Sequence, residues 1–211
     1  YEMEKVNGIP MSRLFLSEEL TTEQLDHIIG SINRIHSCKN NDNVNIYLNY
    51  TSKLRNRYDK EYYSQFNNSE NIFNELLEYF TNYESENKGI KSIIHGDPVL
   101  TNILINQFGK IKLIDMRGKQ GNIKTLSGDS LYDWAKIYQS LIGYDEILED
   151  KEINNDYKKL LLSHFEKKYL EINNKNDLTE LKMITKLLLF TLLPLHNNEK
   201  CSKYYNLIYS F

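Results

Sequence analysis

The 211-residue sequence predicts a single, mainly helical α+β unit built around one short β-hairpin. Residues 93–118 contain two apolar runs, Ile103–Ile105 and Ile111–Ile114, which a short loop containing Gly109 separates. Two β-prone runs joined by a short loop with glycine are typical of a hairpin. On both sides of this stretch, apolar residues recur at helical spacing, and no repeat or low-complexity linker divides the chain.

Three helices are expected before the hairpin. Thr21 and Thr22 supply an N-cap region for the first, which extends to about His36, a residue that we interpret as structural. The second is expected over Val44–Tyr58 and the third over Asn71–Tyr83, each with apolar residues on one face. We interpret the basic side chains in and just after the second helix as a solvated face: Lys53, Arg55, Arg57 and Lys60.

The remainder of the chain is expected to be helical. A helix should begin near Ser130, for which Asp129 is a candidate N-cap. Apolar residues on wide faces predict two further helices over Tyr157–Leu170 and Leu178–Leu193, and Pro194 should end the second of them.

Composition excludes several classes of function. The net charge of −3 provides no electrostatic basis for binding nucleic acid. The longest apolar stretch, Leu187–Leu195, is too short to span a bilayer, and no signal-peptide pattern opens the chain. Cys38 and Cys201 lack the spacing of metal ligands, so we expect two unpaired thiols in a reducing, cytoplasmic compartment.

Polar side chains lie at both ends of the expected hairpin. Asp97 and Asn102 precede its first arm, and Asp115 directly follows its second arm. Because a hairpin brings the start of one arm close to the end of the other, these three side chains can converge. Each alone would be explained as a turn residue. Together they form an all-oxygen set that suits Mg²⁺, and such a sparse set implies that a nucleotide supplies further ligands.

The same residues carry a family resemblance. The sequence H-G-D-x-x-x-x-N, from His95 to Asn102, is followed by a hairpin and Asp115. This pattern resembles the catalytic core of the aminoglycoside phosphotransferase and choline kinase superfamily, small-molecule relatives of protein kinases. The resemblance implies a protein-kinase-like large lobe in which Asp97 accepts or orients the proton of the substrate hydroxyl. Asn102 and Asp115 would hold Mg²⁺ on the phosphates of ATP or another NTP.

Two flanking stretches extend the resemblance. In the resembled families, the residue at the position of His95 braces the catalytic loop. Gly128–Lys136 resembles the G-D-x-x-Y-D-x-A-K stretch of phosphotransferase-like proteins, in which Asp133 would hydrogen-bond the backbone of that loop. With the sequence I-D-M-R-G at 114–118, this stretch is most similar to the phosphotransferase-like domains of bacterial surface-polysaccharide loci.

The first residues resemble the hinge of a kinase. Tyr1–Gly8 contains M-E-x-V-x-G, which would place Met3 behind an adenine and the backbone of Glu4 and Val6 at its hydrogen-bonding edge. An ordinary edge strand and turn is the alternative. Leu104 is a candidate floor for the adenine pocket, with a core leucine as the alternative.

If the hinge assignment holds, residues 1–8 are a remnant of the hinge strand and residues 9–211 form the large, C-terminal lobe. The small N-terminal lobe would then be absent from this chain and belong to a longer polypeptide, because no Gly-rich phosphate loop occurs here. Within the large lobe, residues 119–211 are expected to form a helical subdomain for the acceptor. Such a lobe alone would bind ATP poorly and catalyse little.

Two other residues have open assignments. Arg117 either contacts phosphate or an anionic substrate, or is surface charge. His196 either lines the substrate side of the cleft or is structural.

The predicted function is ATP- and Mg²⁺-dependent phosphoryl transfer to the hydroxyl of a small molecule, in surface-polysaccharide biosynthesis. Candidate acceptors are a sugar, an amino sugar and an amino alcohol such as choline. A catalytically silent, kinase-like binding or scaffolding domain is the alternative. A protein kinase is disfavoured by H-G-D in place of H-R-D and by the short segment after Asp115.

Overall fold

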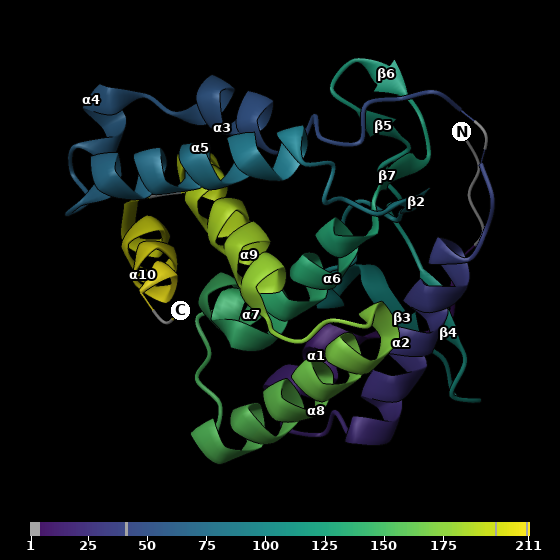
Figure 1. Ribbon diagram of the computed structural model, residues 1–211. Coiled ribbons are helices and arrows are strands. Elements are labelled where there is room, and N and C mark those ends of the chain that lie inside the picture. Colours follow the sequence, from purple (N-terminus) through teal and green to yellow (C-terminus); the bar gives the residue numbers. More distant parts are fainter. Residues whose placement is uncertain (1–4, 41, 197, 210) are drawn as a thin grey trace.

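The computed structural model describes residues 5–40, 42–196, 198–209 and 211, and it has an α+β, mainly helical fold with small sheets (Figure 1). The α-helices are α1 (Met11–Leu16), α2 (Thr22–His36), α3 (Thr51–Arg57), α4 (Lys60–Tyr63), α5 (Ser69–Ser85), α6 (Ser130–Gln139), α7 (Asp145–Leu148), α8 (Asn155–Asn173), α9 (Thr179–Leu192) and α10 (Asn198–Ile208). The strands are β1 (Ile9–Pro10), β2 (Lys91–Ile93), β3 (Ile103–Ile105), β4 (Ile111–Leu113), β5 (Lys119–Gln120), β6 (Ile123–Lys124) and β7 (Ser127–Asp129).

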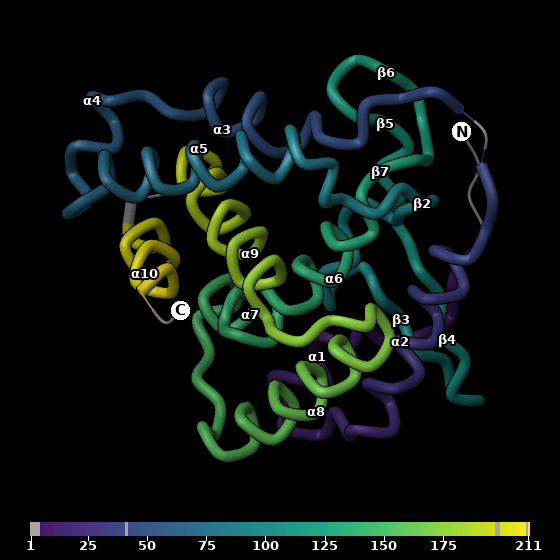
Figure 2. The backbone as a smooth tube through the Cα atoms, in the orientation of Figure 1, coloured from purple at the N-terminus to yellow at the C-terminus, as the bar shows by residue number. Residues whose placement is uncertain are grey.

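Helix α6 lies at the centre of the molecule and packs along α9. Figure 1 shows α3, α4 and α5 on one side of this pair and α1, α2 and α8 on the other, with the strands gathered at one edge. The smooth trace in Figure 2 shows that the chain runs from α5 through the strands into α6 and, after α8, comes back to the centre as α9. The apolar residues of α6 and α9 are almost all buried, which explains why the two helices form the middle of the core.

The predicted hairpin is confirmed. Strands β3 and β4 pair antiparallel, with Ile103 opposite Leu113, and β1 adds a third strand beside β3. The side chain of Asn106 accepts hydrogen bonds from two backbone N–H groups of the connecting loop, and Gly109 adopts a φ of +72° there. A loop of this kind needs one residue in the left-handed region, which glycine adopts without strain.

Several expected helix boundaries are confirmed. Thr21 caps α2 through a capping box with Gln24, and the helix ends at His36 as expected. Asp129 caps α6, which begins at Ser130. Helix α9 ends at Leu192, just before the turn that contains Pro194.

The expected helix over Val44–Tyr58 is wrong in its first half. The Asn45 side chain accepts a hydrogen bond from the backbone N–H of Tyr47, which forms a turn instead of a helix. Helix α3 therefore begins only at Thr51. Helices α1 and α4 were not expected, and residues 119–129, at the start of the expected helical subdomain, form three short strands that were not expected either.

The solvated basic face assigned to this region is also wrong for two of its members. The Arg57 guanidinium donates to the backbone oxygen of Thr191, 2.8 Å away, and Lys53 is half-buried against Tyr132. Arg55 and Lys60 are exposed, as expected. The hydrophobic pattern does not separate these residues, because α3 has a second neighbour, α9, that only the tertiary structure supplies.

A buried carboxylate connects the first helical group to the start of α6. Asp129 Oδ2 accepts hydrogen bonds of 2.7 Å from the hydroxyls of Tyr50 and Tyr83, and Oδ1 accepts from the backbone N–H groups of Ile90 and Leu131. Burial raises the pKa of Asp129, although these four donors favour its ionised form. The network fixes α3, α5 and β2 to one end of α6.

No helix in the described parts of the chain has the length and apolarity needed to cross a membrane. Cys38 is exposed and Cys201 is buried, and both are free thiols.

Replacing Asp129 with alanine should lower the free energy of unfolding by about 3 kcal/mol or more, because buried donors on two tyrosines and two backbone amides lose their acceptor. Urea unfolding followed by circular dichroism measures the change. Tyr83→Phe is the matched control, since it removes only one of these bonds and should cost about 1 kcal/mol. Equal losses in the two variants would show that the network contributes little.

Candidate functional site

Helix α6 holds the loop that contains Asp97 in place. Asp133, which is fully buried, accepts hydrogen bonds of 2.7 Å from the backbone N–H of His95 and 2.8 Å from that of Gly96. His36 Nε2 lies 3.1 Å from the same carboxylate. The imidazole ring of His36 packs edge-on against the ring of Trp134. This is the contact that the resemblance implies for Asp133, and it holds two successive backbone groups of the loop to one side chain.

His95 lies inside the loop and braces it. Its Nδ1 accepts a hydrogen bond from the backbone N–H of Asp97 at 3.3 Å, and its Nε2 is buried without a hydrogen-bond partner among the described residues. Gly96 has a φ of +84°, and a Cβ atom there would lie 2.8 Å from the Cβ of Arg117. Any larger residue at position 96 would therefore be strained and would push Arg117 away.

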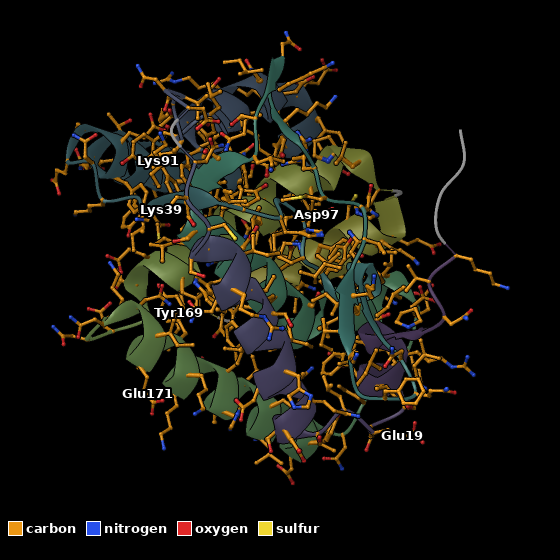
Figure 3. The ribbon with its side chains drawn as sticks, turned by 90° about the vertical axis from the view of Figure 1, so that its right-hand side faces the viewer. Glu19, Lys39, Lys91, Asp97, Tyr169 and Glu171 are labelled. Carbon is orange, nitrogen blue, oxygen red and sulfur yellow. The ribbon has the colours of Figure 1, made fainter. Side chains whose placement is uncertain are left out.

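Asp97 presents an ionised carboxylate at the surface of the loop. Its Oδ1 lies 2.9 Å from Lys136 Nζ, and the side chain is 33% exposed, so an incoming molecule can reach it. In Figure 3, Asp97 lies well inside the outline of the molecule, whereas Glu19 lies at its edge. Burial opposes ionisation, but the charges of Lys136 and Arg117 outweigh burial and lower the pKa of Asp97.

The hairpin brings Asn102 and the segment before Asp115 together. The Asn102 side chain donates to the backbone oxygen of Asp97, 3.0 Å away, and its own backbone oxygen accepts from the N–H of Ile114. Asp115 therefore directly follows the residue that pairs with Asn102. It is exposed and has a φ of 58°, a left-handed conformation that is uncommon outside glycine.

These positions fit a sparse magnesium site. Among the described residues, the oxygen of the Asn102 side chain makes no hydrogen bond, and no group of three or more His, Cys, Asp or Glu side chains has the geometry to hold a metal ion. Mg²⁺ is commonly held by one or two protein oxygens with water and phosphate completing its shell. Asn102 and Asp115 match that arrangement, and a closed protein cage is not present in the described part.

Next to Asp97, positively charged groups surround the hydroxyl of Tyr132. Lys53 Nζ lies 3.1 Å and Arg117 Nη1 lies 3.4 Å from Tyr132 Oη, and Lys136 stands one helical turn further along α6. Burial opposes ionisation of the phenol, but the charges of Lys53, Lys136 and Arg117 lower the pKa of Tyr132 to about 7. We call Lys53, Arg117, Lys136 and Tyr132 the cation row.

Sequence reasoning gave no role to Tyr132 and Lys136 and assigned Lys53 to a solvated face. Tyr132 and Lys136 lie within the quoted G-D-x-x-Y-D-x-A-K stretch, where their separation of one helical turn was a usable signal that they share a face. Lys53 had no such signal, because it reaches Tyr132 from a helix 79 positions earlier in the chain. Arg117 is exposed and its backbone N–H donates to the oxygen of His95, so both alternatives for its side chain stay predictions.

The expected hinge is described only in part. Met3 and Glu4 lie outside the described residues. Val6 is half-buried and lines an open groove of about 1000 Å³ between residues 5–9 and the hairpin loop. Residues 5–8 form no strand, and the strand that pairs with the hairpin is β1 instead. Leu104 is buried outside the main core cluster, on the face of β3 opposite Ile103, and lies against Gly8.

His196 follows the turn that contains Pro194 and lies among aromatic rings. Its ring centroid is 4.8 Å from that of Tyr204 and 6.4 Å from that of Tyr144. Burial raises the pKa of Tyr144 to about 12, and the carboxylates of Asp145 and Asp97 contribute to the rise. Burial lowers the pKa of His196.

The cation row should make Tyr132 the most acidic tyrosine among the described residues. Its pKa of about 7 lies below the usual value of about 10, so the folded protein releases this proton first, and stability should increase with pH between these values. The phenolate absorbance in an ultraviolet pH titration measures it. Tyr132→Phe should remove the early step, and Lys53→Met should move it to higher pH. An unchanged titration in both variants would contradict the cation row.

Comparison with known proteins finds no family model that matches this chain and no curated protein with significant similarity to it.

Proposed function

We propose that this chain is the catalytic lobe of an ATP- and Mg²⁺-dependent phosphotransferase that acts on the hydroxyl of a small molecule. One observation carries the proposal. Asp133 holds the backbone of His95 and Gly96, so that the ionised and accessible carboxylate of Asp97 stands at a fixed place beside Asn102. Phosphoryl transfer depends on such positioning more than on covalent chemistry.

In the proposed reaction, Asp97 accepts a hydrogen bond from the acceptor hydroxyl and orients it toward the terminal phosphorus of the nucleotide. A bond forms between the hydroxyl oxygen and that phosphorus, and the bond from phosphorus to the bridging oxygen breaks. The hydroxyl proton passes to Asp97 and then to solvent, and the nucleoside diphosphate leaves. Lys136, 2.9 Å from Asp97, keeps the carboxylate ionised until that step.

A bound Mg²⁺ would supply charge neutralisation at the phosphates. Asn102 and Asp115 are the residues that would hold it, for the reasons of position and free oxygen atoms given above. Under this proposal Tyr144 and His196, whose ring centroids lie 6.4 Å apart, would line the approach of the acceptor. Under this proposal the C-terminal helices shape the acceptor pocket, and surface-polysaccharide biosynthesis and the cytoplasm are the proposed setting.

Replacing Asp97 with asparagine should reduce phosphoryl transfer by about 10²–10⁴-fold, because the proton acceptor is lost, while Mg²⁺-dependent nucleotide binding is retained. Asp115→Asn should instead weaken Mg²⁺-dependent nucleotide binding, since it removes the charged metal ligand. Calorimetry with Mg²⁺ and ATP, followed by release of nucleoside diphosphate in the presence of candidate alcohols, separates the two effects.

Asp156→Asn is the matched control, because Asp156 is 94% exposed on α8 and its replacement should change neither quantity. Retained turnover in Asp97→Asn would overturn the proposed role of Asp97. Binding of the nucleotide without any dependence on Mg²⁺ or Asp115 would contradict the metal site. If neither this chain nor a version extended upstream through the expected small lobe binds nucleotide, the silent binding domain replaces the enzyme as the better account.

A further inference from the structure

We propose that the acceptor carries an anionic group in addition to its reacting hydroxyl, and that Lys53 and Arg117 bind this group beside Asp97. The class of ligand is a small alcohol that bears a phosphate or a carboxylate. The inference rests on the proposed function for the role of Asp97, but the anion site itself stands on the geometry of the cation row.

The first argument is the balance of charge. Lys53, Arg117 and Lys136 carry three positive charges around Tyr132, and within the described residues the carboxylate that pairs with them at contact distance is Asp97, bound to Lys136. Asp115 acts on Arg117 only through its field. Lys53 has no carboxylate contact, and its nearest polar partner is the neutral or partly ionised phenol. The row therefore has an excess of positive charge that a bound anion would neutralise.

The second argument is the cost of placing Lys53 there. Burial, with the charges of Lys136 and Arg117, lowers the pKa of Lys53 to about 8, whereas attraction to Tyr132 raises it. A lysine held half-buried next to other cations, without a carboxylate, destabilises the folded chain. Arg55, two residues further along α3, points to solvent at no such cost. Such an arrangement is typical of sites that bind anions.

The third argument is position. Tyr132 and Lys136 are one turn apart on the same face of α6, Lys136 is bound to Asp97, and Lys53 is bound to Tyr132, so the four side chains follow one another in space. Arg117 reaches Tyr132 from the segment after β4, where its backbone N–H donates to the backbone oxygen of His95. A small molecule whose hydroxyl meets Asp97 would therefore direct an anionic substituent toward Lys53 and Arg117, which can donate charge-assisted hydrogen bonds to it.

The cation row has a second conceivable use, which is to hold the phosphates of the nucleotide. The two uses differ in a measurable way. An anionic group on the acceptor binds without Mg²⁺ and together with the nucleotide, whereas nucleotide phosphates would compete with it for the same cations. This difference determines the design of the experiment.

The test uses the whole chain without Mg²⁺ and three hexose probes: glucose 6-phosphate, glucuronate and uncharged glucose. Calorimetry at low salt should detect binding of at least one charged probe and none of glucose. Lys53→Met and Arg117→Gln should each weaken that binding by about tenfold, because each removes one charge-assisted contact. The phosphate and carboxylate probes identify which anion the site prefers.

Arg55→Met is the matched control for Lys53→Met, since it removes an exposed cation from the same helix and should leave binding unchanged. Arg117→Gln provides an independent variant at an exposed residue if the half-buried Lys53→Met variant folds poorly. The titration is then repeated with Mg²⁺ and ATP present, and simultaneous binding of the charged probe supports the inference.

Three outcomes would overturn the inference: no binding of either charged probe, equal weakening by Arg55→Met, or competition between the charged probe and the nucleotide. Each is distinct from failure of the proposed function. Absence of nucleotide binding, in this chain and in a version extended upstream through the expected small lobe, contradicts the enzyme but leaves the anion site intact. Mg²⁺-dependent nucleotide binding without binding of a charged probe leaves the enzyme intact and removes the anion site.

Discussion

The candidate site depends on one interaction: the buried carboxylate of Asp133 accepts hydrogen bonds from two successive backbone N–H groups. A buried carboxylate is costly unless donors surround it, and here His95, Gly96 and His36 supply them. Because Asp133 is on the central helix α6, its hydrogen bonds hold the loop firmly against the core. The position of Asp97 is therefore set by the packing of α6 against α9 and not by the loop alone.

Helix α6 carries a second buried carboxylate at its first turn. Asp129 gathers Tyr50 and Tyr83 from the helices on one side, whereas Asp133, four residues later, gathers the loop and His36. One helix thus joins the structural core and the site through two carboxylates spaced one turn apart. Hydrogen-bond donors surround each of the two carboxylates, so both can be buried without an unpaired charge.

Charge is distributed unevenly over the site. The carboxylates of Asp97 and Asp115 lie on one side, and the proposed function gives them the transferred proton and a metal ion. Lys136, bound to Asp97, begins the cation row, which continues to Tyr132 and Lys53. The contact between Asp97 and Lys136 joins the two parts and keeps the carboxylate ionised. Under the two proposals, this separation of negative and positive groups would let a single small molecule be bound at one end and activated at the other.

The sequence by itself determined the local features. It predicted the mainly helical fold, the hairpin from its two apolar runs, the N-caps at Thr21 and Asp129, and the residue pattern from His95 to Asn102. These depend on neighbours within a few positions, so periodicity and turn chemistry are sufficient. The late start of α3 already shows the limit, because an Asx turn at Asn45 overrode the helical spacing.

The tertiary structure alone decided which distant groups meet. Lys53 contacts Tyr132 across 79 positions, and Asp133 reaches His36 across 97. Such contacts depend on how helices cross. The sequence alone does not show which polar side chains of a helix face solvent and which face a distant helix. That is why Lys53 and Arg57 were assigned to solvent while Asp97 and Asp133, held by a local motif, were found. The sequence pattern identifies the chemical groups that a short segment carries, and tertiary packing determines which segments come into contact.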